Sequence, residues 1–156
     1  MNVYADNAAT TAVSDAALAA MLPCFREEYG NPSSLYTVGQ RAKEKMEEAR
    51  ETFARGLGAE PREITFTSGG SEADNQALRS AALLGARKGK KHIISTKFEH
   101  HAILHTLQAL EKEGYEVTLL DIPPDGVVTA EQVKDAIRPD TCLVSIMFAN
   151  NEIGTI

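Results

Sequence analysis

The sequence predicts an α/β fold, a mostly parallel sheet with helices on both faces. Short runs rich in β-branched and apolar residues alternate with longer stretches of helical pattern. These runs are residues 63–66, 92–96, 115–120 and 141–147. The last run is nearly all apolar, which is typical of a parallel strand buried on both faces. With 156 residues, 43% of them hydrophobic, the chain is long enough for one domain with a core.

Two helices and two loops are expected before the first strand. Small polar residues predict a tight turn at residues 6–11, and the composition of residues 29–34 predicts a loop. Ser14 is expected to cap a first helix that has Pro23 near its end. A second helix is expected over residues 38–57. Its predicted core stripe is Ala42, Met46, Ala49 and Phe53.

The stretch over residues 66–75 joins a predicted strand to a predicted helix through Gly69 and Gly70. Paired glycines let a backbone turn sharply and approach a ligand closely. Ser71 is expected to cap the helix, where its hydroxyl and the free N–H groups of the first turn form a cradle for phosphate. Taken alone, the same pattern also fits an ordinary capped turn between a strand and a helix.

Two further polar clusters follow predicted strands. They are Glu99-His100-His101 after the second strand and Asn150-Asn151 after the fourth. Because parallel strands end at one edge of a sheet, three such clusters favour a ligand site there. A helix N-terminus suits phosphate, an imidazole can stack on a flat ring or move a proton, and an amide can bond a ring substituent. Pyridoxal phosphate meets all three requirements.

Composition argues against several classes of partner. The formal net charge is −6 and there is no long basic run, so neither nucleic acid nor an anionic membrane is expected to bind. The first residues lack the pattern of a signal peptide, which predicts a cytoplasmic location. Cys24 and Cys142 have no metal-ligand spacing, and both are expected to be buried and free. No metal site is predicted.

Five motifs occur in order, at residues 6–11, 30–34, 66–75, 99–100 and 150–155. Together they resemble the cysteine desulfurases, which are pyridoxal-phosphate enzymes of the aspartate-aminotransferase fold. The T-S-G-G-S-E-A-D-N and N-N-E-I-G pieces are most similar to the iron–sulfur-assembly and nitrogen-fixation branch. The resemblance covers essentially the whole chain.

The resemblance implies roles for particular residues. Gly70 and Ser71 would hold the cofactor phosphate, with Ser71 standing where many relatives carry threonine. His100 would stack on the pyridine ring and act as the catalytic proton shuttle, and His101 would be only a neighbour. Asn151 would bond the phenolic oxygen of the cofactor ring or lie beside the substrate carboxylate. The alternatives are a surface histidine and an ordinary asparagine turn.

The resemblance also implies a reaction and its partners. Asn31 and the loop over residues 8–11, with Ala9 and Thr10, would line the substrate entrance. The enzyme would convert L-cysteine to L-alanine and pass the sulfur, as an enzyme persulfide, to a scaffold or a tRNA-thiolation protein. A homodimer is expected. The alternatives are a selenocysteine lyase, another class-V enzyme, or a non-catalytic fragment that needs a complementary chain.

Members of this family are considerably longer than 156 residues. Their cofactor-bonding lysine, the aspartate that pairs with the ring nitrogen and the persulfide cysteine match no residue here. We therefore expect residues 1–13 to form an N-terminal segment with the substrate-side loop. Residues 14–156 are expected to be the incomplete N-terminal part of the cofactor-binding large domain. The chain alone is expected to be inactive.

Overall fold

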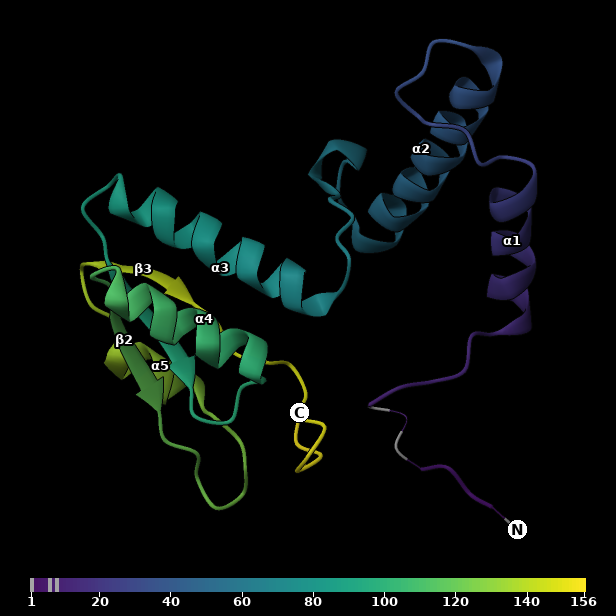
Figure 1. Ribbon diagram of the computed structural model, residues 1–156. Coiled ribbons are helices and arrows are strands. Elements are labelled where there is room, and N and C mark those ends of the chain that lie inside the picture. Colours follow the sequence, from purple (N-terminus) through teal and green to yellow (C-terminus); the bar gives the residue numbers. More distant parts are fainter. Residues whose placement is uncertain (1, 6, 8) are drawn as a thin grey trace. The chain divides into compact units, whose positions relative to one another are not determined.

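The computed structural model describes residues 2–5, 7 and 9–156 (Figure 1). It divides into two compact units, Met1–Phe66 and Thr67–Ile156, and we describe each by itself. Asp6 and Ala8, which belong to the turn predicted at residues 6–11, lie outside the described residues. The predicted separation of residues 1–13 from residues 14–156 is not tested by this division and stays a prediction.

The first unit is helical. It contains α1 (Asp15–Arg26), α2 (Thr37–Leu57) and the short 3₁₀ helix η1 (Pro61–Glu63). Ser14 caps α1 as predicted, because its hydroxyl accepts the Ala17 N–H at 3.2 Å. Pro23 lies within α1. Although α2 has 21 residues, neither it nor any other helix of the described residues is long and apolar enough to cross a membrane.

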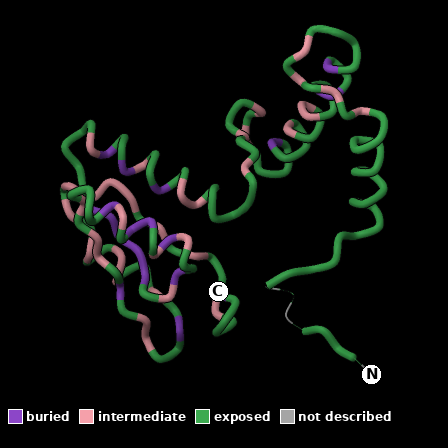
Figure 2. The backbone as a smooth tube through the Cα atoms, viewed as in Figure 1, coloured by how far each residue is buried: buried purple, intermediate pink, exposed green. Residues whose placement is uncertain are grey.

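Little of this helical unit is buried (Figure 2). No residue of α1 is buried, and of the predicted stripe on α2 only Ala42 is. Met46 is half-buried, whereas Ala49 and Phe53 are exposed, so the stripe prediction was only partly right. Cys24 is also exposed, contrary to prediction. Helical spacing indicates which residues can share a face, but it does not supply a surface to cover that face.

The strand predicted at residues 63–66 is not formed. Residues 64–67 lie in no helix or strand, and Phe66 is 46% exposed. The side chain of Arg50 donates to the Ile64 carbonyl, so a side chain occupies an acceptor that a strand partner would use. The Phe66 ring meets Phe53 edge to face at 5.8 Å between centroids, and Arg50 lies over it. Local side-chain contacts therefore replace sheet pairing here.

The second unit carries the sheet. Its elements are α3 (Gly70–Ala86), β1 (His92–Thr96), α4 (His101–Lys112), β2 (Glu116–Leu120), α5 (Ala130–Ala136) and β3 (Thr141–Val144). The strand order is β2-β1-β3 and both pairings are parallel, which confirms the predicted fold class. The connections from β1 to β2 and from β2 to β3 run in opposite directions across the sheet. Right-handed crossovers therefore place α4 and α5 on opposite faces.

The core lies between the sheet and the helices α3 and α4. Its buried residues are Leu78, Ala82, Ile93, Ile103, Leu107 and Leu110. Every residue of β1 is buried, whereas β3 is an edge strand, half-buried up to an exposed Val144. The expectation of a β3 buried on both faces and running to residue 147 was wrong. The half-buried Cys142 packs under Gly85, where an added Cβ would lie 2.3 Å from the Cys142 Cβ.

Candidate functional site

The candidate site lies at the carboxyl end of β1, within residues 67–156. A groove of about 370 Å³ between α3 and α4 is lined by Ser71 and His100, among others. A second hollow of about 460 Å³ is lined by His100 and Asn151. His100 and His101 border both hollows, so the structure brings all three predicted polar clusters to one edge of the sheet.

The start of α3 differs from its prediction. Gly69 is the N-cap and Gly70 the first helical residue, so Ser71 lies one position inside the helix and does not cap it. Gly69 is extended and Gly70 is helical, and neither needs the conformational freedom of glycine. The Glu72 carboxylate instead accepts the Ser68 N–H at 2.6 Å and the Ser68 hydroxyl at 2.7 Å. These hydrogen bonds lower the pKa of Glu72.

The space in front of α3 is open. A Cβ built on Gly69 or Gly70 meets no heavy atom within 4 Å. The N–H groups of the first turn have no acceptor within a helix, and the helix dipole favours an anion there. The exposed Ser71 hydroxyl lines the adjoining groove. These groups would fit a phosphate, and the roles of Gly70 and Ser71 stay predictions.

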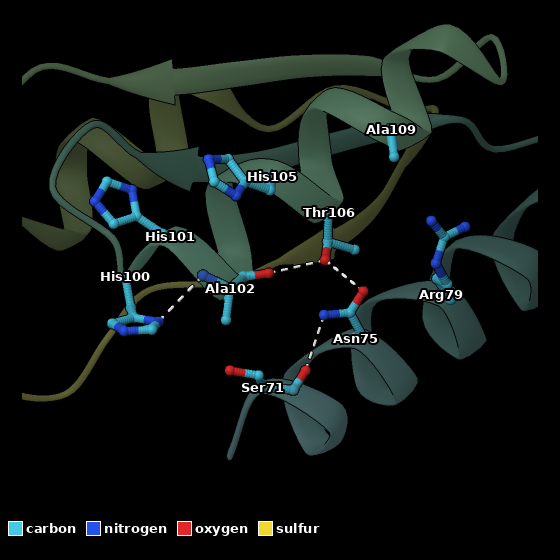
Figure 3. A pocket seen from close by; sticks show the side chains of 9 residues that line it. All are labelled: Ser71, Asn75, Arg79, His100, His101, Ala102, His105, Thr106 and Ala109. Atoms are coloured by element: carbon cyan, nitrogen blue, oxygen red, sulfur yellow. Dashed lines mark hydrogen bonds between the residues drawn. The ribbon is translucent and has the colours of Figure 1, made fainter. Parts of the chain in front are cut away.

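A hydrogen-bond chain that includes the buried Thr106 joins α3 to α4 under this groove (Figure 3). Thr106 is 3% exposed, and its hydroxyl lies 2.7 Å from Asn75 Oδ1 and 2.8 Å from the Ala102 carbonyl oxygen. Asn75 in turn donates from Nδ2 to the Ser71 carbonyl at 2.8 Å. The chain thereby links the Ser71 turn to the start of α4. Sequence reasoning missed Thr106, because a lone threonine inside a helix carries no signal of its packing partner.

His100 caps α4, and this contact fixes its tautomer. Its Nδ1 accepts the Ala102 N–H at 3.1 Å, so the proton of the neutral ring is on Nε2. The residue is exposed, and Figure 3 shows it opposite Ser71 at one end of the groove. His100 therefore presents Nε2 as its free, exchangeable nitrogen.

Glu99 joins the ends of β1 and β3. It is 7% exposed, and its Oε1 accepts the Met147 N–H at 2.7 Å and the Thr96 hydroxyl at 3.0 Å. Burial raises the pKa of this carboxyl, and the two hydrogen bonds oppose that shift. The carboxylate supplies an acceptor to Met147, which lies in the segment that follows β3. It thus anchors the segment that leads to Asn150.

The two asparagines have different surroundings. Asn150 is 6% exposed, donates to the Phe98 carbonyl at 3.0 Å and accepts the Glu152 and Ile153 N–H groups at 2.8 and 3.0 Å. Asn151 is exposed and borders the second hollow. Asn150 therefore shapes the loop, and the ligand-binding role of Asn151 stays a prediction.

The predicted substrate-side residues belong to residues 1–66. Asn31 is exposed, and its Oδ1 accepts the Ser33 N–H at 3.0 Å within the loop. Ala9 and Thr10 are exposed. The backbone at Val38 passes close to Gly30 within this unit. A Cβ added to Gly30 would lie 2.2 Å from the Val38 carbonyl oxygen. The roles of Asn31, Ala9 and Thr10 stay predictions.

A parallel sheet with polar side chains at the carboxyl end of its strands is typical of α/β proteins, which bind their ligands at that edge. The family model for class-V aminotransferases matches residues 3–156, and the chain belongs to this family.

The relatives narrow this assignment. The chain is 55% identical over 154 residues to the cysteine desulfurase IscS of Clostridium botulinum (strain Kyoto / Type A2), covering 99% of this chain and 38% of that protein. A solved "NIFS-LIKE PROTEIN" matches all of this chain and 43% of its own, with 44% identity and a TM-score of 0.94. A structure of "SspA in complex with cysteine" matches 93% of this chain and 42% of its own, with 39% identity and a TM-score of 0.86. The match to these structures confirms the predicted aminotransferase-like fold.

Proposed function

We propose that the chain is the cofactor-binding part of a cysteine desulfurase that uses pyridoxal phosphate. The observation that supports this most is the meeting of Ser71, His100 and Asn151 around two adjoining hollows. The similarity to the Clostridium botulinum cysteine desulfurase and to a structure in complex with cysteine supports L-cysteine as substrate. Because the chain spans 38% of that relative's length, the activity belongs to a longer, completed protein.

The start of α3 would hold the cofactor. The first-turn N–H groups of Gly70 and Ser71 and the Ser71 hydroxyl would bind its phosphate without needing a cation. Asn151, as an uncharged amide, would bond the ring oxygen or the substrate carboxylate. When bound, the cofactor supplies an electron sink for negative charge that develops on the substrate.

His100 would stack on the ring and move protons through Nε2. Its Nδ1 is held by the Ala102 N–H, so proton exchange at Nε2 leaves the helix cap intact. In the overall reaction the substrate C–S bond breaks and an S–S bond forms with an enzyme thiol. One S–H bond also breaks, its proton is balanced by the new C–H bond of the alanine methyl group, and no external oxidant is required.

The remaining parts of the proposal concern the surroundings of the site. Asn31, Ala9 and Thr10 would line the substrate entrance. The sulfur would pass to an iron–sulfur scaffold or a tRNA-thiolation protein, and the enzyme would act in the cytoplasm as a homodimer. A selenocysteine lyase would share the same groups, and no contact in residues 67–156 favours it.

The test uses a completed chain, in which residues 1–156 replace the matched segment of the Clostridium botulinum relative. His100→Asn keeps a side chain that caps helices well but removes the imidazole. We expect alanine formation from L-cysteine to fall by about 10²- to 10⁴-fold, the usual contribution of a proton-transferring group. Thermal unfolding is expected to stay within a few degrees of the parent.

His101→Gln is the matched control, since it removes the neighbouring imidazole from the same turn of α4. It is expected to leave alanine formation within about twofold of the parent. Equal losses in both variants, or full activity in His100→Asn, would remove His100 from the mechanism. A completed chain that binds no pyridoxal phosphate in a titration followed by visible absorbance would refute the proposed function as a whole.

A further inference from the structure

A pair of histidines on α4 has no role in the proposed reaction. His101 and His105 lie four residues apart on one helix, so their side chains project from the same face. Their rings are stacked, with centroids 5.4 Å apart and planes 22° from parallel. Figure 3 shows both rings on the α4 side of the groove that Ser71 and His100 also line.

The ring nitrogens of this pair are available. Both side chains are exposed, and neither makes a hydrogen bond or ion pair within the described part of the chain. The other two histidines are engaged. His92 is fully buried and contacts Thr141 and Thr118 through its two nitrogens, and His100 uses Nδ1 as a helix cap.

The spacing of the pair suits a shared metal ion. Two imidazole nitrogens that bind one ion at about 2.0–2.1 Å in tetrahedral geometry lie about 3.4 Å apart, which requires ring centroids about 5 Å apart. The observed 5.4 Å is close to this value. The second side-chain torsion of histidine has broad energy wells, so exposed rings can tilt until the two nitrogens converge.

We propose that His101 and His105 form a bidentate site for a divalent transition metal on the exposed face of α4. Pairs of histidines at this helical spacing are metal ligands in other proteins. No metal site was predicted from the sequence, because its two cysteines have no metal-ligand spacing. No group of three or more histidine, cysteine or acidic ligands occurs in the described residues, so water would complete the coordination of the ion.

Ligand chemistry selects the ion. Neutral imidazole binds Zn²⁺, Ni²⁺ and Cu²⁺, whereas Mg²⁺ and Ca²⁺ prefer oxygen ligands. The histidine pair is expected to bind Cu²⁺ more tightly than Ni²⁺. Because the second imidazole binds intramolecularly, the pair should exceed a single histidine by about 10²-fold in affinity.

The test measures Ni²⁺ binding to the 156-residue chain by calorimetry. His101→Gln and His105→Gln should each weaken binding by at least about tenfold, because either change removes the chelate. The decisive control exchanges two side chains, combining His105→Gln with Gln108→His. This variant keeps the composition of the chain but separates the two imidazoles by about 10 Å along the helix. It should bind as weakly as the single variants.

Electron paramagnetic resonance of the Cu²⁺-loaded chain gives a second readout. The parent is expected to show two equatorial imidazole nitrogens, and the exchange variant one. Equal Ni²⁺ affinity in the parent and the exchange variant, or a parent spectrum with a single nitrogen, would overturn the proposal. These measurements need no pyridoxal phosphate and no turnover, so their failure is distinguishable from failure of the proposed function.

Discussion

Residues 1–66 and residues 67–156 are both rich in apolar side chains, but the second unit buries many more of them. In α1, Leu18, Met21, Leu22 and Phe25 are between 43% and 70% exposed. In β1 all five residues are buried, and the helices α3 and α4 close over one face of the sheet. The difference is the sheet itself, which gives each helix a broad apolar surface to cover.

This comparison also separates the proposed site into two parts. The groups assigned to the cofactor, Ser71, His100 and Asn151, are borne by the unit that has its own core. The groups assigned to the substrate entrance belong to the unit that buries little by itself. The cofactor side should therefore be preorganised by residues 67–156, whereas the local stability of the entrance loops should be low.

The largest difference in unfolding free energy is expected when a helical leucine is changed to alanine in each of the two units. Leu107→Ala removes a leucine that is 2% exposed in the core between α4 and β1, which should cost about 2–5 kcal/mol of unfolding free energy. Leu22→Ala removes a leucine that is 43% exposed on α1, and should cost less than about 1 kcal/mol. Both sites are helical, so helix propensity cancels. Urea unfolding measures the two values, and equal losses would refute the difference in packing.

A smaller contrast is expected between the adjacent asparagines of the second unit. Asn150→Ala removes the side chain that bonds the Phe98 carbonyl and the Glu152 and Ile153 N–H groups, which should cost about 1–3 kcal/mol. Asn151→Ala changes an exposed side chain and should stay within about 0.5 kcal/mol of the parent. In the completed chain, Asn151→Ala should instead weaken binding of pyridoxal phosphate or L-cysteine. A stability loss confined to Asn151→Ala would reverse the roles that the structure gives them.

The sequence predicted most elements of the second unit because their signals are local. The alternation of apolar strands and helices and the polar residues after β1 and β3 are visible along the chain. The errors lie where a partner decides the outcome. Residues 64–67 pair with no strand, Ser71 is not the cap, and Cys24 is not covered. Thr106 and the contact of Glu99 with Met147 join residues distant in sequence, and no local pattern predicts them.

The smallest effect expected is a pH dependence that separates a buried carboxylate from an exposed one. Burial raises the pKa of Glu99, so in the folded state it keeps its proton at pH values where the unfolded chain has lost it. The folded state then binds more protons, and stability falls as pH rises from the ordinary glutamate pKa of about 4.3 up to the folded value. Glu99→Gln removes this titration while leaving an oxygen that can accept the Met147 N–H.

Its matched control is Glu72→Gln, because Glu72 also accepts a backbone N–H but is exposed. Hydrogen bonds from Ser68 lower its pKa, so its contribution is present above the ordinary pKa and lost as pH falls through the folded value. The stability difference between Glu99→Gln and the parent should therefore grow with pH above about 4.3, whereas that for Glu72→Gln should change only below it. For the titration of one proton, the unfolding free energy cannot change by more than about 1.4 kcal/mol per pH unit. Urea unfolding between about pH 3 and pH 7, a range that extends below the ordinary glutamate pKa, measures both differences. Parallel curves for Glu99→Gln and the parent would show that the two hydrogen bonds to Glu99 cancel the effect of its burial.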